Sequence, residues 1–216
     1  MKGFFSVEGA FFTVTGKICD MVVITVLWAV GCIPVVTFFT STASMYHTTV
    51  KCIRYDRGKV FEEFKDAYKK NLKQGIPLGI LYGAVGGGIA AGDHYVLGMA
   101  ASGTGAGVFQ AAVMLLVSVL YAENLIWMIP VFSRFCDSFG NILRLDYVIS
   151  SRYILRGVPM MLIIAAGALL IWISIPLVII VPSLSALALS YLSEPGMHKY
   201  MPAEPENSGD WRYGRR

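Results

Sequence analysis

Charged side chains are scarce in this sequence of 216 residues. Asp, Glu, Lys and Arg make up 15% of it, against about 25% in an average soluble domain, and hydrophobic residues make up 56%. No Lys or Arg occurs from Gly75 to Trp127. These features exclude a disordered protein, a nucleic-acid-binding domain and an ordinary cytosolic enzyme. They indicate an all-α, polytopic membrane protein that contacts the lipid bilayer and has no nucleic acid partner.

Cysteine is also scarce, and its spacing forms no signature. The four cysteines are Cys19, Cys32, Cys52 and Cys136, without a CxxC pair or a nearby histidine at metal-ligand spacing. This pattern indicates neither a metal site nor a disulfide framework. The HExxH and GxSxG motifs of hydrolytic enzymes are absent as well. We therefore expect no enzyme activity, no metal and no cofactor.

Four apolar stretches are long enough to cross a bilayer, which needs roughly 20 apolar residues in a helix. These predicted spans cover about residues 21–43, 76–97, 108–132 and 158–181. The last stretch continues without charge to Leu192 but contains Pro176 and Pro182. We favour one helix to about residue 181 followed by an interfacial helix over residues 183–192. The alternative is a hairpin of two short spans, which gives five spans in total.

The predicted spans form a single transmembrane domain over residues 1–193. Residues 194–216 carry four basic and four acidic side chains with Pro and Gly, and are expected to form a polar, disordered tail. Eight of the 18 Lys and Arg residues lie in residues 51–74 and four in residues 134–157. Because cytoplasmic loops collect positive charge, these two segments are expected inside the cell and residues 98–107 outside.

The two basic segments end alike. In each, a basic helix end is followed by Gly, a β-branched residue and Pro, at residues 72–77 and 154–159. Gly after a helix end and Pro at the start of the next helix are typical of a helix–turn–helix, so a turn is predicted at Gly75 and at Gly157. One interpretation is a duplicated hairpin, as in some transporters. The other is that turn chemistry alone produces this order.

Several segments resemble the YesL family. Leu27-Trp28 is followed by Ile-Pro-Val-Val-Thr at residues 33–37 and Ser-Met-Tyr at residues 44–46. Phe61, Phe64 and Tyr68 then lead through Lys-Lys-Asn-Leu into the second span, and residues 182–187 read Pro-Ser-Leu-Ser-Ala-Leu. The resemblance covers about residues 5–200.

The resemblance implies a small, multi-pass protein of the bacterial cell membrane, from a family without an established activity. Members are often encoded near carbohydrate ABC transporters and polysaccharide-degrading enzymes. The resemblance brings no catalytic residue with it.

Glu123-Asn124 is the sharpest polar feature of the spans, with Tyr121 two residues earlier. A carboxylate inside a span costs several kcal/mol unless it faces protein or water. One interpretation is a proton- or substrate-coordinating site made by these three residues. The other is a structural hydrogen bond to a neighbouring helix. Asp93-His94, at the outer end of the second span, is a weaker candidate pair, because polar residues are also usual where a helix meets water.

Two further surfaces are predicted from spacing. Glycines four residues apart in the second span allow close helix packing, within the chain or in a homo-oligomer. They are Gly79, Gly83, Gly87, Gly88 and Gly92. Phe61, Phe64 and Tyr68 recur at helical spacing in the first basic segment, which indicates an amphipathic helix on the inner membrane surface and a candidate docking surface.

Two functions follow as expectations. The first is an accessory or scaffold partner of a carbohydrate uptake system of the ABC type, which contacts its permease subunits. The alternative is a small dimeric carrier with Glu123 in its translocation pathway.

Overall fold

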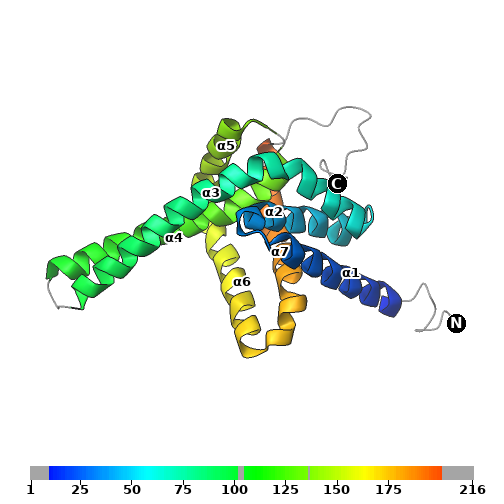
Figure 1. Cartoon of the computed structure of the whole chain (residues 1–216), viewed down its shortest axis with the longest axis horizontal. Helices are drawn as coiled ribbons and strands as arrows, with labels where there is room; N and C mark the ends of the chain where they lie inside the picture. The colour runs from blue at the N-terminus through cyan, green and yellow to red at the C-terminus, as the bar shows by residue number, and fades with distance from the viewer. Residues whose placement is uncertain (1–9, 102–104, 136, 201–216) are drawn as a thin grey trace.

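The computed structural model describes residues 10–101, 105–135 and 137–200, which form helices and turns without a strand (Figure 1). The α-helices are α1 (Ala10–Gly31), α2 (Phe38–Thr48), α3 (Val60–Ala100), α4 (Gly105–Arg134), α5 (Phe139–Arg152), α6 (Ile154–Ile173) and α7 (Val181–Met197). Shorter helical segments are η1 (Val35–Thr37), η2 (Thr49–Arg54), η3 (Ile175–Ile179) and η4 (His198–Tyr200). The predicted all-α fold is confirmed.

Four of the described helices are long and apolar enough to cross a membrane. They are Thr13–Gly31, Val60–Ala100, Gly105–Arg134 and Ile154–Ile173. Most of their surface is exposed, since at most 22% of the most apolar window of any of them is buried. The chain is therefore compatible with a multi-pass membrane protein whose apolar helices contact lipid.

The first span ends earlier than the predicted residues 21–43. Helix α1 stops at Gly31, and the extended backbone of Pro34 (ψ 113°) turns the chain. The Thr37 hydroxyl lies 2.8 Å from the carbonyl oxygen of Gly31 and 2.7 Å from that of Pro34, which satisfies acceptors at the end of α1. Because the chain reverses here, α2 packs back along α1.

Helix α2 is the centre of the molecule. It contacts α1, α3, α4 and α7, and most of its side chains are buried although many carry a hydroxyl group. Ser44 donates to the Thr40 carbonyl at 2.8 Å, Thr48 to the Ser44 carbonyl at 2.9 Å, and Ser41 to the Trp28 carbonyl of α1 at 2.9 Å. These three buried hydroxyl groups are thus paired with backbone oxygens, whereas the buried Thr40 hydroxyl has no hydrogen-bond partner. Small side chains let the neighbouring helices approach closely.

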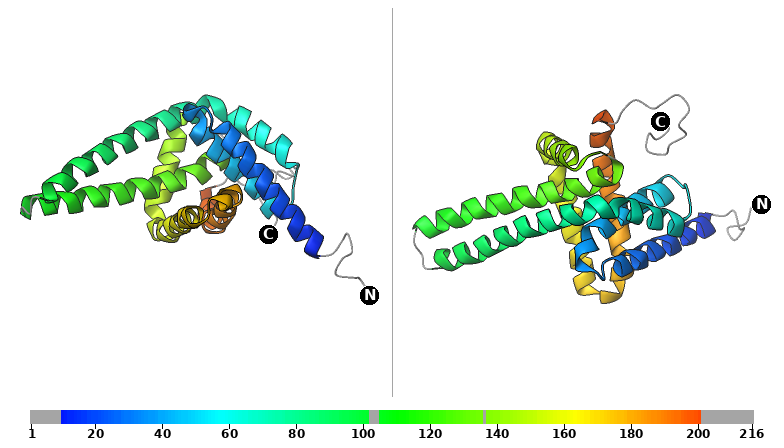
Figure 2. Two further views of the ribbon diagram at one scale, coloured as in Figure 1. Left: turned by 60° about the horizontal axis from the view of Figure 1, so that its bottom comes forward. Right: turned by 45° about the horizontal axis from the view of Figure 1, so that its top comes forward.

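The turn predicted at Gly75 is absent. Helix α3 continues through Gly75 and Pro77 for 41 residues and bends midway (Figure 2). Pro77 has no backbone N–H, which removes one helical hydrogen bond and favours a kink rather than a break when packing holds both halves. That packing is present, because Gly75 lies against Thr40 and the Leu78 side chain is fully buried.

The turn predicted at Gly157 is also wrong. The chain leaves the helical path at Tyr153, between α5 and α6, and both Gly157 and Pro159 lie inside α6. Gly157 is used instead for close packing against Glu123 of α4. The Gly–β-branched–Pro order marks a turn at neither place.

The fourth predicted span also ends early. Helix α6 stops at Ile173, Pro176 lies in η3, and α7 returns along α6 with Gly167 facing Ser185 and Val181. The prediction of one helix to about residue 181, followed by an interfacial helix, is therefore wrong. Helix α7 packs against α6 and has buried side chains along its length.

The polar tail begins later than residue 194. Glu194 and Met197 belong to α7 and are buried. Residues 201–216 lie outside the described residues.

The C-terminal half of α3 and the N-terminal half of α4 form a hairpin that projects away from the other helices (Figures 1 and 2). Its outer surface carries exposed large apolar side chains, among them Ile80, Val85, Leu97, Val108, Phe109, Leu115 and Leu116. In the described chain, α3 and α4 pair with each other there. The surface must be covered by lipid or by another membrane helix.

Candidate functional site

Glu123 lies where α4 approaches α6. Only 6% of its surface is exposed, and its side chain lies against Gly157, where a Cβ atom would be 2.5 Å from the Glu123 Cγ atom. The Trp127 indole N–H approaches the Glu123 carboxylate as its nearby donor, but Nε1 and Glu123 Oε1 do not reach full hydrogen-bond geometry. Burial of a carboxylate with incomplete hydrogen bonding is costly.

Asn124 faces the other side of α4 and joins a second group of polar side chains. Its Oδ1 atom lies 2.8 Å from the Tyr82 hydroxyl of α3, and its Nδ2 atom lies 2.8 Å from Asp146 Oδ2 of α5. The Tyr82 hydroxyl is also 3.0 Å from Asp146 Oδ2. We call Tyr82, Asn124 and Asp146 the junction triad. Ser150 Oγ lies 3.2 Å from Asn124 Nδ2, at the edge of this triad.

Asp146 was not predicted from the sequence. It is 1% exposed, its Oδ1 atom has no hydrogen-bond partner, and it lies on the buried face of α5 with Ile142, Ile149 and Ser150. Burial raises the pKa of Asp146 to about 7, and the nearby Glu123 carboxylate adds to the rise, while hydrogen bonds from Tyr82 and Asn124 act in the opposite direction. The signal that could have found it is its helical spacing with these apolar positions.

Tyr121 contacts the backbone of Tyr82 and is not itself a member of the triad. Its hydroxyl donates to the backbone carbonyl of Tyr82 at 2.5 Å, and its ring lies against Gly86 of α3. Thus the three predicted residues of α4 face different neighbours: Glu123 faces α6, Asn124 faces α3 and α5, and Tyr121 faces α3. The site that the sequence predicts from these three residues stays a prediction, and the structure adds Tyr82 and Asp146 to the contacts of Asn124.

A buried ion pair joins the end of α4 to the end of α7. Arg134 Nε donates to Glu194 Oε1 at 2.7 Å, and Arg134 Nη2 contacts Glu194 Oε2. The Tyr46 hydroxyl of α2 lies 2.7 Å from Ser193 Oγ and 3.4 Å from Glu194 Oε1. Both charges are buried and the guanidinium binds the carboxylate in a bidentate way. The ion pair is therefore a structural link between α2, α4 and α7.

His47, at the end of α2, also connects α2 to α4. Burial lowers the pKa of His47 to about 4, so its imidazole ring is neutral. Its Nδ1 atom lies 3.3 Å from the Ser133 carbonyl oxygen, to which the neutral ring donates. Within the described residues no cluster of three or more metal-ligating side chains occurs.

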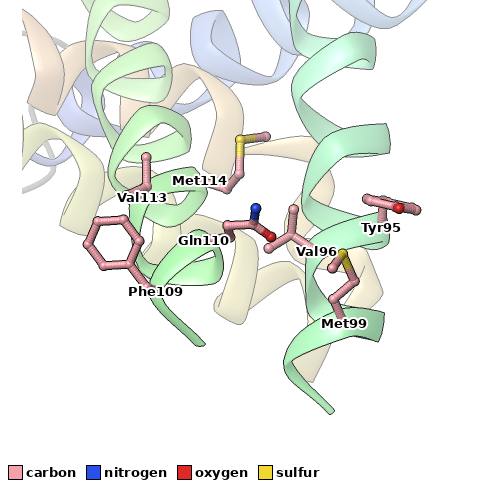
Figure 3. Close-up of a pocket in the computed structure, with 7 residues that line it drawn as sticks. All are labelled: Tyr95, Val96, Met99, Phe109, Gln110, Val113 and Met114. Carbon is pink, nitrogen blue, oxygen red and sulfur yellow. The ribbon is translucent and has the colours of Figure 1, made fainter. Parts of the chain in front are cut away.

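Asp93 and His94 do not form a pair. Asp93 Oδ2 accepts a hydrogen bond of 2.7 Å from the Ser118 hydroxyl of α4, while the His94 side chain is exposed. Near them, at the tip of the hairpin, lies an open pocket of about 470 Å³ (Figure 3). Its lining is mostly apolar and consists of Tyr95, Val96, Met99, Phe109, Gln110, Val113 and Met114.

The predicted docking surface is not formed as expected. Phe61 is 60% exposed, but Phe64 is 6% exposed and belongs to the core. Tyr68 stacks on Phe64 with ring centroids 6.1 Å apart, and its hydroxyl reaches the Gly31 carbonyl at 3.4 Å. The apolar stripe of this part of α3 faces α1 and α2, because both lie on the same side of it.

The predicted packing glycines divide into two groups. Gly79 lies against Phe39 of α2, and Gly92 lies against Met114 of α4. Gly83, Gly87 and Gly88 have open space where a Cβ atom would lie. The first two glycines therefore pack within the chain, while the other three face outward.

The Arg134–Glu194 pair gives a stability prediction. Glu194→Ala leaves the Arg134 charge buried without a partner, and the free energy of unfolding should fall by about 3–5 kcal/mol. Asp56→Ala, which breaks the exposed pair between Lys17 and Asp56, should cost less than about 1 kcal/mol. Denaturant titration in detergent measures both variants. Equal losses in the two would contradict a structural role for the buried pair.

Comparison with known proteins gives one partial match. Residues 21–92 are similar to a family described as "Protein of unknown function, DUF624". No curated protein and no solved structure matches the chain. The matched segment covers α2, half of α1 and most of α3, but it ends before Glu123, Asn124 and Asp146. The resemblance to the YesL family stays a prediction.

Proposed function

We propose that this chain is a small carrier of the bacterial cell membrane, in which Glu123 and the junction triad form the polar part of the translocation pathway. One observation carries the proposal. Glu123 is a carboxylate inside a candidate span, nine-tenths buried, and it forms no ion pair with a described residue. Ionisable residues inside membrane spans are rare, costly and by default functional.

The contrast with Glu194 supports this assignment. Glu194 is equally enclosed, yet both of its carboxylate oxygens contact Arg134, as a structural acid requires. Glu123 and Asp146 form no ion pair in the described part of the chain, and each has an oxygen without a hydrogen-bond partner. Two neighbouring acids kept without basic partners suit a site that takes up a cation or a polar solute.

Carbohydrate is the class of solute that we propose. The support comes from the resemblance to the YesL family, whose members are encoded near carbohydrate uptake systems. The chemistry agrees, because sugar hydroxyl groups donate to carboxylates and bind to amide groups such as that of Asn124.

A second candidate is an accessory subunit that packs against the permease of a carbohydrate ABC transporter, or against a second copy of this chain. One observation favours it. Gly83, Gly87 and Gly88 lie on the projecting hairpin of α3 and α4 and face open space. Glycines at such spacing allow another membrane helix to approach closely. Of the predicted docking residues Phe61, Phe64 and Tyr68, Phe61 is the one whose side chain is strongly exposed.

Transport by reconstituted protein tests the carrier. Proteoliposomes are supplied with a panel of radiolabelled mono- and disaccharides, and uptake is compared between the unchanged chain, Glu123→Gln and Glu62→Gln. Glu123→Gln should abolish uptake, because the amide cannot carry the charge or the proton of the pathway. Glu62 is exposed at the start of α3, so Glu62→Gln should transport normally. Unchanged uptake by Glu123→Gln, or uptake of no sugar by the unchanged chain, would contradict the proposal.

Co-purification in mild detergent from the native host tests the accessory role. Stoichiometric recovery of an ABC permease is the expected result, and Gly83→Leu should abolish it by blocking close approach. Gly16→Leu is the matched control, since Gly16 also faces open space but lies on α1. Recovery that is equal in both variants would rule out the hairpin as the contact surface.

A further inference from the structure

The junction triad lacks one hydrogen if Asp146 is ionised. Its three mutual contacts are Tyr82 with Asn124, Asn124 with Asp146, and Tyr82 with Asp146, at 2.8, 2.8 and 3.0 Å. With Asn124 Oδ1 facing the phenol, the tyrosine donates its single hydrogen to Asn124, and the Asn124 NH2 group donates to Asp146. Nothing is then left to donate between the Tyr82 oxygen and Asp146 Oδ2.

The other orientation of the Asn124 amide gives the same count. If the NH2 group faces Tyr82, it donates to the phenol oxygen, and Tyr82 donates to Asp146 Oδ2. Asn124 Oδ1 and Asp146 Oδ2 then face each other at 2.8 Å as two acceptors. In both orientations one contact of the three lacks a hydrogen, and a proton on Asp146 Oδ2 supplies it.

Ser150 does not provide the missing hydrogen. Its hydroxyl lies 3.2 Å from Asn124 Nδ2 and 3.3 Å from the Tyr147 carbonyl, and it has no contact with Asp146 Oδ2. It accepts from the amide in the first orientation and donates to a carbonyl oxygen in either one.

We infer that the junction triad is a proton-binding site, in which Asp146 carries one proton on Oδ2 and donates it to Tyr82 or Asn124. The inference deepens the proposed carrier and rests on the same site: it names the proton as the coupling ion. Binding forms an O–H bond on the carboxylate and breaks one in a hydronium ion, which leaves as water, and release reverses this step.

The surroundings of Asp146 favour reversible binding. The titratable groups that face it are Tyr82 from α3 and Glu123 from α4, and no Lys or Arg pairs with it in the described chain. Its buried Oδ1 atom has no hydrogen-bond partner, so no further donor offsets the cost of burying the ionised carboxylate. Burial with a neighbouring acid holds the pKa of Asp146 at about 7, where small changes in pH change its occupancy.

Release of the proton has a structural consequence. It leaves two acceptor oxygens in contact, so the contacts among Tyr82, Asn124 and Asp146 must rearrange when the proton leaves. Proton occupancy is therefore linked to the hydrogen bonds that join α3, α4 and α5.

Infrared spectroscopy of purified protein, labelled with ¹³C at the aspartate side-chain carboxyl, tests the site without any solute. The label separates aspartate from Glu123. The unchanged chain should show the C=O band of a buried protonated aspartic acid, which disappears with a midpoint near pH 7. Asp146→Asn should lack the band, and Asp93→Asn should keep it. No band at any pH from about 5 to 9, or a band that persists in Asp146→Asn, would overturn the inference.

Tyr82→Phe is a second test, which does not depend on how Asp146→Asn folds. The hydrogen bond from Tyr82 holds the pKa of Asp146 down, so loss of the phenol should keep the band and move its midpoint to higher pH. A band that vanishes in Tyr82→Phe, or a midpoint that does not move, would show that the titrating acid is not the one that contacts Tyr82 and would contradict the inference.

The failure of this inference and of the carrier are distinguishable. A titrating band in a protein that takes up no sugar would leave the proton site standing and remove the carrier. Sugar uptake that depends on Glu123, with no aspartic acid band, would keep the carrier and remove the proton from Asp146.

Discussion

Burial of the hydroxyl-rich helix α2 is the constraint on which the rest of the structure depends. A polar group removed from water costs free energy unless it finds a hydrogen-bond partner. In α2 the partners are carbonyl oxygens of its own previous turn and of α1, as with Ser44 and Ser41. Small side chains at these positions bring α1, α3, α4 and α7 close around it. This arrangement replaces the long apolar first span that the sequence predicts.

The enclosure of α2 also places the candidate site. Phe39 of α2 stacks on Tyr82 of α3, with ring centroids 6.1 Å apart, and contacts Phe132 of α4 at 5.6 Å. Through Phe39 these contacts connect α3 to α4, and the same Tyr82 meets Asn124 and Asp146 with its hydroxyl group. Structural polar groups at the other end of α4 are paired, as Arg134 and Glu194 are. Glu123 and Asp146 form no ion pair within the described residues, and this difference from Glu194 is the basis of the proposed carrier.

The fold class and the position of Glu123-Asn124 could be predicted because charge inside an apolar run is conspicuous. Asp146 could not be predicted in the same way, since it lies between Arg144 and Arg152 in a segment whose charge indicates a solvated loop. Only contact with α3 and α4 buries it. Helix ends were the least predictable feature. Helix α3 continues through Pro77 because Leu78 and its neighbours are packed. Helix α1 ends before Pro34, where the Thr37 hydroxyl bonds the carbonyl oxygen at the helix end.

Thiol accessibility tests the enclosure of α2 most directly. In a background with Cys19, Cys32, Cys52 and Cys136 replaced by alanine, single cysteines are introduced by Ser44→Cys and by Val35→Cys. The native protein should leave the first unlabelled by a small water-soluble maleimide and label the second, because Ser44 is fully buried and Val35 is exposed. Both should react after denaturation. Rapid labelling of Ser44→Cys in the native protein would contradict a buried α2 and the helix junction that depends on it.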